Sequence, residues 1–371
     1  MSAAPGEAYV ISSPAPLIEA LAAAGWRVIG PRESDGTISY EELWDPDDLP
    51  RGRSDDQEAG HYRLTDGRPD SWFDYVVGPQ SWKKWLFPAR RKLWSAEKTA
   101  DGFQIDDRAE EYPKTAFFGV RPCEIAAIER QDAVFDNGDF TDTDYTRRRA
   151  ATLIVAVQCA RSAATCFCAS MNTGPHADEG FDLALTELDP EGNHRFLLQI
   201  GSADGAALAD TLPLRDATED DKAAARLAAS SAAAQQTRRL PADIAPRLKG
   251  KENHPGWQDV AEKCLHCANC TLACPTCFCS DVEDTNDLTG DNTERWRVWD
   301  SCFSVDFSYI HGGAVRQDPA ARYRQWLTHK LSTWHDQFGS SGCVGCGRCI
   351  AWCPVGIDIT EEAISIARDD G

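Results

Sequence analysis

The sequence lacks long apolar runs, an excess of basic residues and the common nucleotide-binding loops. No apolar stretch approaches the roughly 20 residues that a membrane helix needs, so we expect no membrane segment. The 38 basic and 59 acidic residues leave a net charge of −21, which argues against nucleic-acid binding by a generally basic surface. Because neither a G-x-G-x-x-G after an expected strand nor a G-x-x-x-x-G-K-[ST] loop occurs, the chain offers no nucleotide site of its own.

Two further signals are missing. The first residues, Met1 to Glu7, contain no basic region, twin arginine or apolar core, so we expect no export signal and a cytoplasmic protein. The C-x-x-C-H motif is absent, which excludes haem attachment of the c type.

Cysteine, in contrast, is abundant. The 15 cysteines gather in short runs, which indicates metal thiolates rather than disulfides. One run reads C-x2-C-x2-C-x3-C-P and is repeated about seventy residues later. Each run is the bacterial-type ligand set of a [4Fe–4S] cluster. The first run comprises Cys264, Cys267, Cys270 and Cys274, and the second comprises Cys343, Cys346, Cys349 and Cys353.

The last cysteine of each run is expected to serve the cluster of the other run, as in two-cluster ferredoxins. We call the two predicted ligand groups the first set and the second set. A structural zinc site is the alternative, but zinc typically uses two C-x2-C pairs, without the third cysteine and the C-P ending. The first set is Cys264, Cys267, Cys270 and Cys353, and the second set is Cys343, Cys346, Cys349 and Cys274.

The N-terminal part predicts a parallel βαβ unit. Residues 115–120 and 152–157 are apolar runs of strand length, and residues 122–135 have helical periodicity with Pro122 in the first turn. Cysteines follow both strands, at the carboxyl edge where α/β folds place ligands. We call these four the N-terminal set: Cys123, Cys159, Cys166 and Cys168.

We predict a third [4Fe–4S] cluster at the N-terminal set. The positive end of the helix at Pro122 would lower the pKa of these thiols and favour an anionic cluster, with Arg121 and Arg161 acting in the same sense. Zinc and ordinary reduced thiols remain alternatives, because this prediction depends on the fold.

The remaining segments carry weaker signals. We expect strands at 9–11, 26–29 and 73–77, a helix at 14–24, and mostly loop with at most a short hairpin at 33–70. Residues 181–188 and 195–200 predict a hairpin that turns at 190–193, and residues 218–238 predict an exposed helix. The basic and aromatic segment 81–94 is either a packed helix, a docking surface or a source of cations near a cluster.

The fold class expected is α+β, with an α/β-like N-terminal domain followed by a mainly α-helical two-cluster ferredoxin domain. The expected boundaries are residues 1–240 for the N-terminal domain, 241–254 for a linker and 255–371 for the ferredoxin domain. The long spacer between the cysteine runs favours this helical type over a compact ferredoxin, since residues 316–338 have helical periodicity and 360–368 form a closing helix. Cys277, Cys279 and Cys302 are expected to pack around the iron sites, with a further metal or a ligand role as alternatives.

Four segments carry a family resemblance: CLHCANCTLACPTCFCSDVED from Cys264, FGVRPCEI from Phe118, TCFCASMNTGP from Thr165 and GCVGCGRCIAWCPVGI from Gly342. They resemble the β subunits of soluble cytoplasmic [NiFe] sulfhydrogenases, or NADP-linked hydrogenases, and anaerobic sulfite reductases contain a similar iron–sulfur subunit. The resemblance covers most of the chain from about Asp74. Ala268 departs from it, standing at a non-ligand position where the family often has glycine.

The resemblance implies an iron–sulfur electron-transfer subunit without catalysis of its own. It would relay electrons between a catalytic module and a flavin-containing NAD(P)H-oxidoreductase subunit. That module would be the small and large [NiFe] hydrogenase subunits or, in the similar family, a sirohaem sulfite reductase. The resemblance also implies that the N-terminal set binds a cluster. A redox sensor and a self-contained cluster enzyme with substrate near Arg121 are the other hypotheses.

Overall fold

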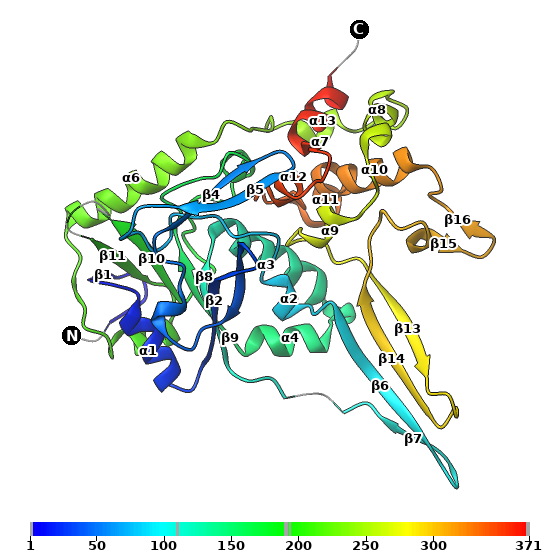
Figure 1. The fold of residues 1–371 in the computed structure, drawn as a ribbon, viewed down its shortest axis with the longest axis horizontal. Coiled ribbons are helices and arrows are strands. Elements are labelled where there is room, and N and C mark those ends of the chain that lie inside the picture. The colour runs from blue at the N-terminus through cyan, green and yellow to red at the C-terminus, as the bar shows by residue number, and fades with distance from the viewer. Residues whose placement is uncertain (1–2, 109–110, 189–191, 193, 369–371) are drawn as a thin grey trace.

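A mixed eight-stranded sheet carries the N-terminal part of the protein (Figure 1). The computed structural model describes residues 3–108, 111–188, 192 and 194–368. The strand order is β12-β1-β11-β10-β9-β8-β2-β3, in which β2, β8, β9 and β10 are parallel neighbours and the other pairs are antiparallel. The strands are β1 (Ala8–Ile11), β2 (Arg27–Ser34), β3 (Thr37–Glu42), β8 (Thr115–Val120), β9 (Thr152–Val157), β10 (Leu183–Leu188), β11 (Arg195–Ile200) and β12 (Arg215–Asp216).

The predicted βαβ unit is confirmed. Strand β8 leads into helix α3 (Pro122–Phe135), a second helix α4 (Thr143–Ala150) follows, and β9 returns parallel to β8. The apolar residues of β8 and β9 are almost all buried, as is usual for central strands of a parallel sheet covered on both faces. Their carboxyl ends therefore meet at one edge.

Helices α1 (Ala15–Ala23), α5 (Ala203–Ala209) and α6 (Glu219–Gln235) complete this half. The predicted helix at 218–238 is thus present, and it is the long helix α6 at the upper left in Figure 1. The side chain of Thr218 caps its first turn, and alanines 225, 229 and 232 are buried. The expected turn at 190–193 lies largely outside the described residues.

Three local predictions were wrong. Residues 73–77 form no strand; Glu187 accepts hydrogen bonds from the amides of Trp72 and Phe73, which holds the chain in an irregular buried path. Segment 33–70 is richer in strand than predicted, with β3 and a hairpin of β4 (Arg53–Glu58) and β5 (His61–Asp66). Segment 81–94 contains only the short helix α2 (Lys83–Leu86), because Pro88 ends it and strand β6 begins at Arg90.

The C-terminal part is built mainly of short helices around a second hydrophobic core. Helix α7 lies inside the predicted linker, and Ile244 and Leu248 pack into this core. The helices are α7 (Ile244–Arg247), α8 (Gly256–Lys263), α9 (Asn269–Leu272), α10 (Pro319–Thr328), a π-helical turn (His329–Thr333), α11 (Trp334–Phe338), α12 (Arg348–Ala351) and α13 (Ile359–Ala367). The α+β class is confirmed, and in the described residues no helix is long and apolar enough to span a membrane.

The spacer between the cysteine runs is less helical than predicted in its first half. Strands β13 (Ser280–Asn286) and β14 (Asn292–Trp299) pair with β6 (Arg90–Thr99) and β7 (Gly102–Asp106) in a four-stranded sheet. This sheet, which we call the arm, projects from the body at the lower right in Figure 1. A smaller hairpin of β15 (Tyr309–Ile310) and β16 (Gly313–Ala314) also stands out from the surface. The arm joins strands from the N-terminal and C-terminal parts of the chain.

A buried ion pair at the second cysteine run links the N-terminal and C-terminal parts of the chain. Arg348 of α12 donates to Glu124 of α3 at 2.7 Å, and the two side chains are 5% and 1% exposed. Arg348 also donates to the carbonyl of Gly78 at 3.1 Å, while Tyr40 donates its hydroxyl hydrogen to the other oxygen of Glu124. Neither charge is left without a partner, which is the condition for burying an ion pair at tolerable cost.

Replacing Glu124 with glutamine should destabilise the protein by about 3 kcal/mol, because the charge of Arg348 would stay buried without its counter-ion. The matched control is Asp284→Asn, which removes an exposed pair with Arg295 and should cost much less stability, because solvent screens that pair. Denaturant unfolding of anaerobically purified variants measures both changes. Equal losses would contradict the role given to the buried pair.

Candidate metal centres

The two cysteine runs fold into equivalent loops. In each run the amide two residues after the first cysteine donates to its sulfur: His266 to Cys264 and Gly345 to Cys343, both at 3.4 Å. A short helix then carries the third cysteine, α9 in the first run and α12 in the second. The repeated sequence therefore gives a repeated geometry, in which amide hydrogens and thiols face the same space.

Both loops need two residues in the left-handed backbone region. In the second run these are Gly345 and Gly347, with φ of 63° and 76°, whereas in the first run they are His266 and Ala268, with φ of 52° and 65°. A side chain in this region is strained. Ala268, the departure from the family pattern, thus stands at a position where glycine relieves strain.

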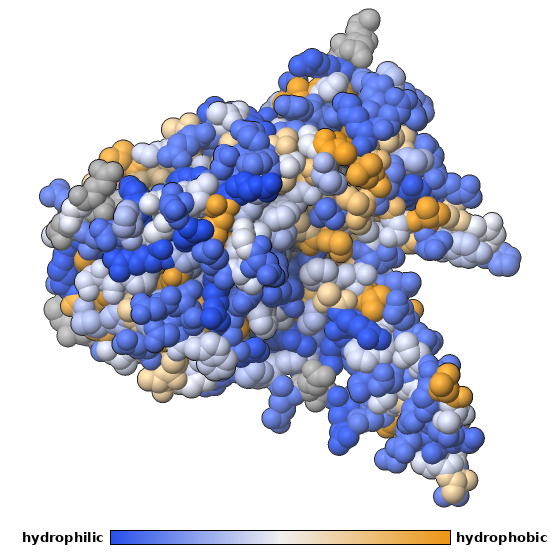
Figure 2. All heavy atoms as spheres, viewed as in Figure 1, coloured by the Kyte–Doolittle hydropathy of each residue, from blue (hydrophilic) through white to orange (hydrophobic). Residues whose placement is uncertain are grey.

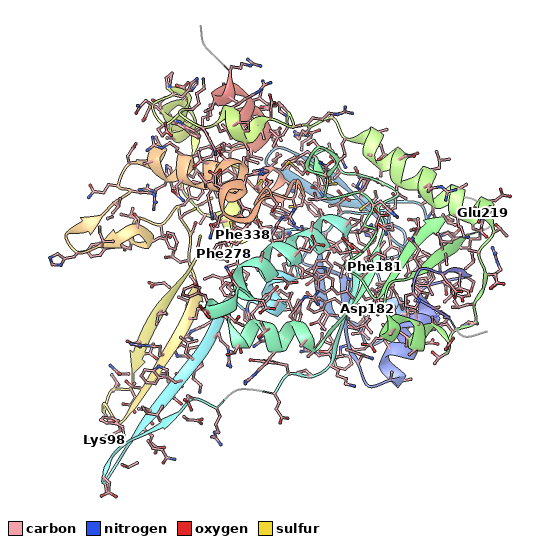
Figure 3. All side chains as sticks on the ribbon, turned by 180° about the vertical axis from the view of Figure 1, so that it is seen from behind. Lys98, Phe181, Asp182, Glu219, Phe278 and Phe338 are labelled. Carbon is pink, nitrogen blue, oxygen red and sulfur yellow. The ribbon has the colours of Figure 1, made fainter. Side chains whose placement is uncertain are left out.

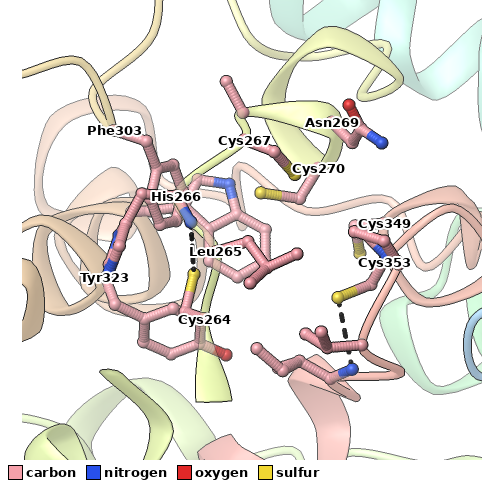
Figure 4. Close-up of a pocket in the computed structure, with 15 residues that line it drawn as sticks. Cys264, Leu265, His266, Cys267, Asn269, Cys270, Phe303, Tyr323, Cys349 and Cys353 are labelled. Atoms are coloured by element: carbon pink, nitrogen blue, oxygen red, sulfur yellow. Dashed lines mark hydrogen bonds between the residues drawn. The ribbon is translucent and has the colours of Figure 1, made fainter. Parts of the chain in front are cut away.

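The first set lines a small cavity that is open to the surface (Figure 4). Its apolar wall includes Phe303, Tyr323 and Trp326. The close-up shows the sulfur atoms of Cys264 and Cys353 on opposite sides of the opening, which come from the two different runs. The amide of Ile357 donates to the sulfur of Cys353 at 3.3 Å. All four predicted ligands, Cys264, Cys267, Cys270 and Cys353, line this cavity, together with Cys349.

The second set also converges. Burial raises the pKa of Cys349 well above its usual value, and the neighbouring thiols Cys343, Cys346 and Cys274 raise it further. Cys270 of the first set acts on Cys349 in the same way. The structure thus brings the crossover cysteine Cys274 to the second run and places the first and second sets next to each other.

The N-terminal set lies at the predicted edge of the sheet. Cys123 is in the first turn of α3, Cys159 follows β9, and Cys166 and Cys168 lie in the next loop. Burial raises the pKa of Cys166 well above its usual value, and Cys168 and Cys159 add to the shift. Burial raises the pKa of the Cys123 thiol well above its usual value, and Cys168 and Cys346 add to the shift, so the predicted lowering of the thiol pKa by the helix end at Pro122 is wrong for this thiol.

Hydrogen bonds fasten the N-terminal set to the second run. The amide of Phe167 donates to the carbonyl of Gly345 at 2.9 Å, and the side-chain hydroxyl of Thr173 donates to that of Val344 at 2.7 Å. Cys346 accordingly raises the pKa of Cys123. The three groups of thiols therefore follow one another through the protein, with the second set in the middle.

Buried cations accompany the thiols. Lys330 lies on the π-helical turn and donates to Thr276 at 3.0 Å; burial opposes its charge, but Cys274, Cys277 and Cys343 raise its pKa well above the usual value. Arg121 approaches Cys159 at 3.9 Å and also donates to the carbonyls of residues 73 and 75. Arg161 does not face the cysteines as predicted; it pairs with Asp55 at 2.8 Å.

Lys83 belongs to the basic segment 81–94, and the sequence did not single it out as a cation near the cysteines. Its ammonium lies 3.9 Å from the ring centre of Trp299, and burial lowers its pKa while Cys277 and Cys274 oppose that change. Of the alternatives for segment 81–94, a source of cations near the cysteines therefore fits Lys83. In the sequence, only the tryptophans of this segment suggested that it would be buried.

Among the described residues, no group of three or more His, Cys, Asp or Glu side chains is drawn together closely enough to hold a single metal ion. A [4Fe–4S] cluster places its ligands around a body of iron and sulfide rather than around one ion. Thiols spread about a shared cavity, with amide hydrogens directed at their sulfurs, fit such a group.

Comparison with known proteins agrees with this geometry. The model of a family described as a 4Fe-4S dicluster domain matches residues 263–357. The protein is also 30% identical over 336 residues to sulfhydrogenase 2 subunit beta of Pyrococcus furiosus, an alignment that covers 90% of each chain. The chain belongs to the sulfhydrogenase β-subunit family.

Membership of the sulfhydrogenase β-subunit family confirms the resemblance drawn from the four motifs. The protein is an iron–sulfur, electron-transfer protein, and its dicluster domain accounts for two [4Fe–4S] clusters. That domain begins at residue 263 and does not include the N-terminal set, whose third cluster remains a prediction.

We expect a methyl group at the second left-handed position to cost stability in both loops. We expect Ala268→Gly to stabilise the protein by up to about 1 kcal/mol, because it relieves left-handed strain. Gly347→Ala should destabilise it by about 3 kcal/mol, since the added carbon would lie 2.3 Å from the carbonyl oxygen of Thr165. Thermal unfolding under argon measures both, and a stabilising Gly347→Ala would contradict the packing described here.

Proposed function

We propose that the first and second sets are the ligands of the two clusters in the dicluster domain. The cavity lined by the whole first set is the observation that carries this assignment. Under it, Cys353 and Cys274 each cross to the other run, so the two loops cannot separate without losing ligands. When bound, such clusters accept and donate single electrons.

We also propose that the N-terminal set holds a third [4Fe–4S] cluster. Four buried or half-buried thiols at one sheet edge support it, as do their neighbours Arg121 and Gln236, whose amide donates to Cys168 at 3.2 Å. Positive charge and donors near the sulfur atoms stabilise an anionic cluster and raise its potential. We also propose that residues 1–240 and 255–371 form separate domains, with the third cluster in the first of them.

The protein then acts as an electron relay. Cys346 raises the pKa of Cys123, and Cys270 raises the pKa of Cys349; these electrostatic effects between neighbouring sets support an unbroken order of three sites. Within this order the first set has the most open position. Cys267 is exposed, as are the neighbouring Leu265 and Val355 at 63% and 42%. Apolar side chains also gather over this region in Figure 2.

Electrons would therefore leave or enter the chain near the first set, through a docked partner. The relative's name, sulfhydrogenase, supports a hydrogenase complex as the setting. We propose that a flavin-containing NAD(P)H-oxidoreductase subunit lies at one end of the relay, with the [NiFe] hydrogenase small and large subunits at the other. Since the chain has no nucleotide-binding motif, the partner must supply the hydride chemistry.

Reduction experiments test the relay. NADPH alone should leave the anaerobic protein's visible absorbance unchanged, and NADPH with the flavoprotein subunit should bleach it, while dithionite bleaches it in either case. Direct bleaching by NADPH without the partner would contradict the relay.

Iron analysis tests the third site. Three clusters predict about 12 irons per chain, and the double variant Cys166→Ser/Cys168→Ser should fall to about 8, since the dicluster domain keeps its ligands. The matched control, Ser170→Ala, changes a hydroxyl in the same loop and should leave the count at about 12. A wild-type count near 8, or zinc in place of the missing iron, would contradict the third cluster.

A further inference from the structure

One buried cation of the interior, Lys330, is held at both its backbone and its side chain. It lies on the π-helical turn that follows α10. Its carbonyl oxygen accepts hydrogen bonds from the amide of Gly342 at 2.8 Å and from the hydroxyl of Ser341 at 3.0 Å. The oxygen of that hydroxyl also accepts from the amide of Cys343 at 3.1 Å. The backbone of Lys330 is therefore tied to the start of the second cysteine run.

The side chain of Lys330 reaches the crossover cysteine through a single hydroxyl group. Its ammonium donates to Oγ1 of Thr276 at 3.0 Å, and this oxygen lies 3.2 Å from the sulfur of Cys274. Oγ1 of Thr276 is also within 2.7 Å of the carbonyl oxygen of Gly342, to which it donates. The lysine, the threonine and the predicted ligand thus form one continuous polar chain.

The hydrogen count of this chain gives it a direction. A threonine hydroxyl has one hydrogen to donate, and it accepts the hydrogen of the lysine ammonium with a lone pair. A cysteine that binds metal has lost its proton, so its sulfur can only accept. With Cys274 as a ligand, the hydrogen of Thr276 is therefore shared between the carbonyl of Gly342 and the sulfur, and the ammonium polarises it toward both.

Aromatic rings pack around the same place. Phe278 lies 5.8 Å from Trp334 between ring centres, and Figure 3 shows Phe278 close to Phe338. Trp334 packs directly on Gly342, where an added methyl carbon would lie 2.8 Å from its ring. Because solvent screens a buried charge less than an exposed one, the ammonium of Lys330 acts strongly on its neighbours here.

We propose that Lys330, acting through Thr276, is a positioning residue that raises the reduction potential of the cluster held by the second set. Positive charge nearby and a hydrogen bond to a ligand sulfur both stabilise the more negative, reduced state of a cluster. Reduction adds one electron to the cluster and neither makes nor breaks a bond. This role rests on the proposed ligands of the second set, and it adds a control at the middle site of the relay.

A purely structural lysine would behave differently. If Lys330 only held the second run in place, its loss would change the free energy of unfolding and leave the reduction potential as it was. The other buried lysine of this region, Lys83, differs in its partners: it donates to the main-chain carbonyls of Thr271 and Leu272 at 3.4 and 3.3 Å. Lys330 is thus the lysine whose hydrogen bonds lead to a ligand sulfur.

A potentiometric titration of the full chain, followed by electron paramagnetic resonance, tests the proposal. Lys330→Met removes the charge and keeps a side chain of similar shape. At a fixed solution potential, the ratio of reduced to oxidised second cluster should fall at least about tenfold, a shift of about 59 mV to lower potential for a one-electron couple. The iron content should stay that of the wild type. Cys274→Ser identifies the signal of the second cluster, because it changes a ligand of that cluster alone.

The control and the second variant separate charge from structure. Lys249→Met removes the same charge from an exposed lysine, which pairs with Asp336 at 2.6 Å, and should shift no potential. Thr276→Val keeps the lysine but removes the hydroxyl and should lower the same potential, whereas Thr276→Ser should keep it near the wild-type value.

Three results would overturn the proposal. They are an unchanged potential of the second cluster in Lys330→Met or in Thr276→Val, an equal shift in Lys249→Met, and a loss of about four irons in both Lys330→Met and Thr276→Val, which would leave the two residues a structural role only. A wild-type protein without a cluster signal that depends on Cys274 would instead overturn the proposed function.

Discussion

The packing of the second cysteine run against the N-terminal thiol loop is the constraint on which the rest of the structure depends. Gly345 and Gly347 lie so close to residues 165–168 that even a methyl group would meet the backbone at 2.7 and 2.3 Å. Hydrogen bonds from Phe167 and Thr173 close the same contact. Because the closest approaches in this contact are to backbone atoms, they fix the separation of the two thiol groups more firmly than side-chain packing alone could. A relay needs such fixed spacing between its carriers.

Charge balance is the second constraint. The protein as a whole is acidic, with a net charge of −21, yet the interior beside the thiols is cationic, with Arg121, Lys83, Lys330 and Arg348. Anionic clusters and their thiolates supply the negative charge that makes buried lysine and arginine tolerable. The buried pair between Arg348 and Glu124 has a double role in this view. It joins the two parts of the chain, and its guanidinium lowers the pKa of both Cys346 and Cys123 against the effect of burial.

Much of this arrangement could be predicted from the sequence, because cysteine spacing and apolar strand runs are local signals. The repeated C-x2-C-x2-C-x3-C-P pattern led to both ligand runs, and the strand–helix–strand pattern around Cys123 led to the sheet edge. The arm could not be predicted, since β6 and β14 pair across some two hundred residues. Segment 73–77 looked like a strand but is held by Glu187 and Arg121, and neither contact has a local signal. Lys83 was visible only as part of a basic segment; its burial against Trp299 depends on that long-range pairing.

The central claim is that three thiol sets follow one another through the protein and that each holds one iron–sulfur cluster. Anaerobic X-ray diffraction of the full chain, recorded on both sides of the iron absorption edge, tests it most directly. The account predicts three separate centres of iron scattering. One lies among Cys264, Cys267, Cys270 and Cys353, a second at the set that contains Cys274, and a third among Cys123, Cys159, Cys166 and Cys168. Iron confined to the two cysteine runs, or a single heavier ion such as zinc at the N-terminal set, would contradict the account.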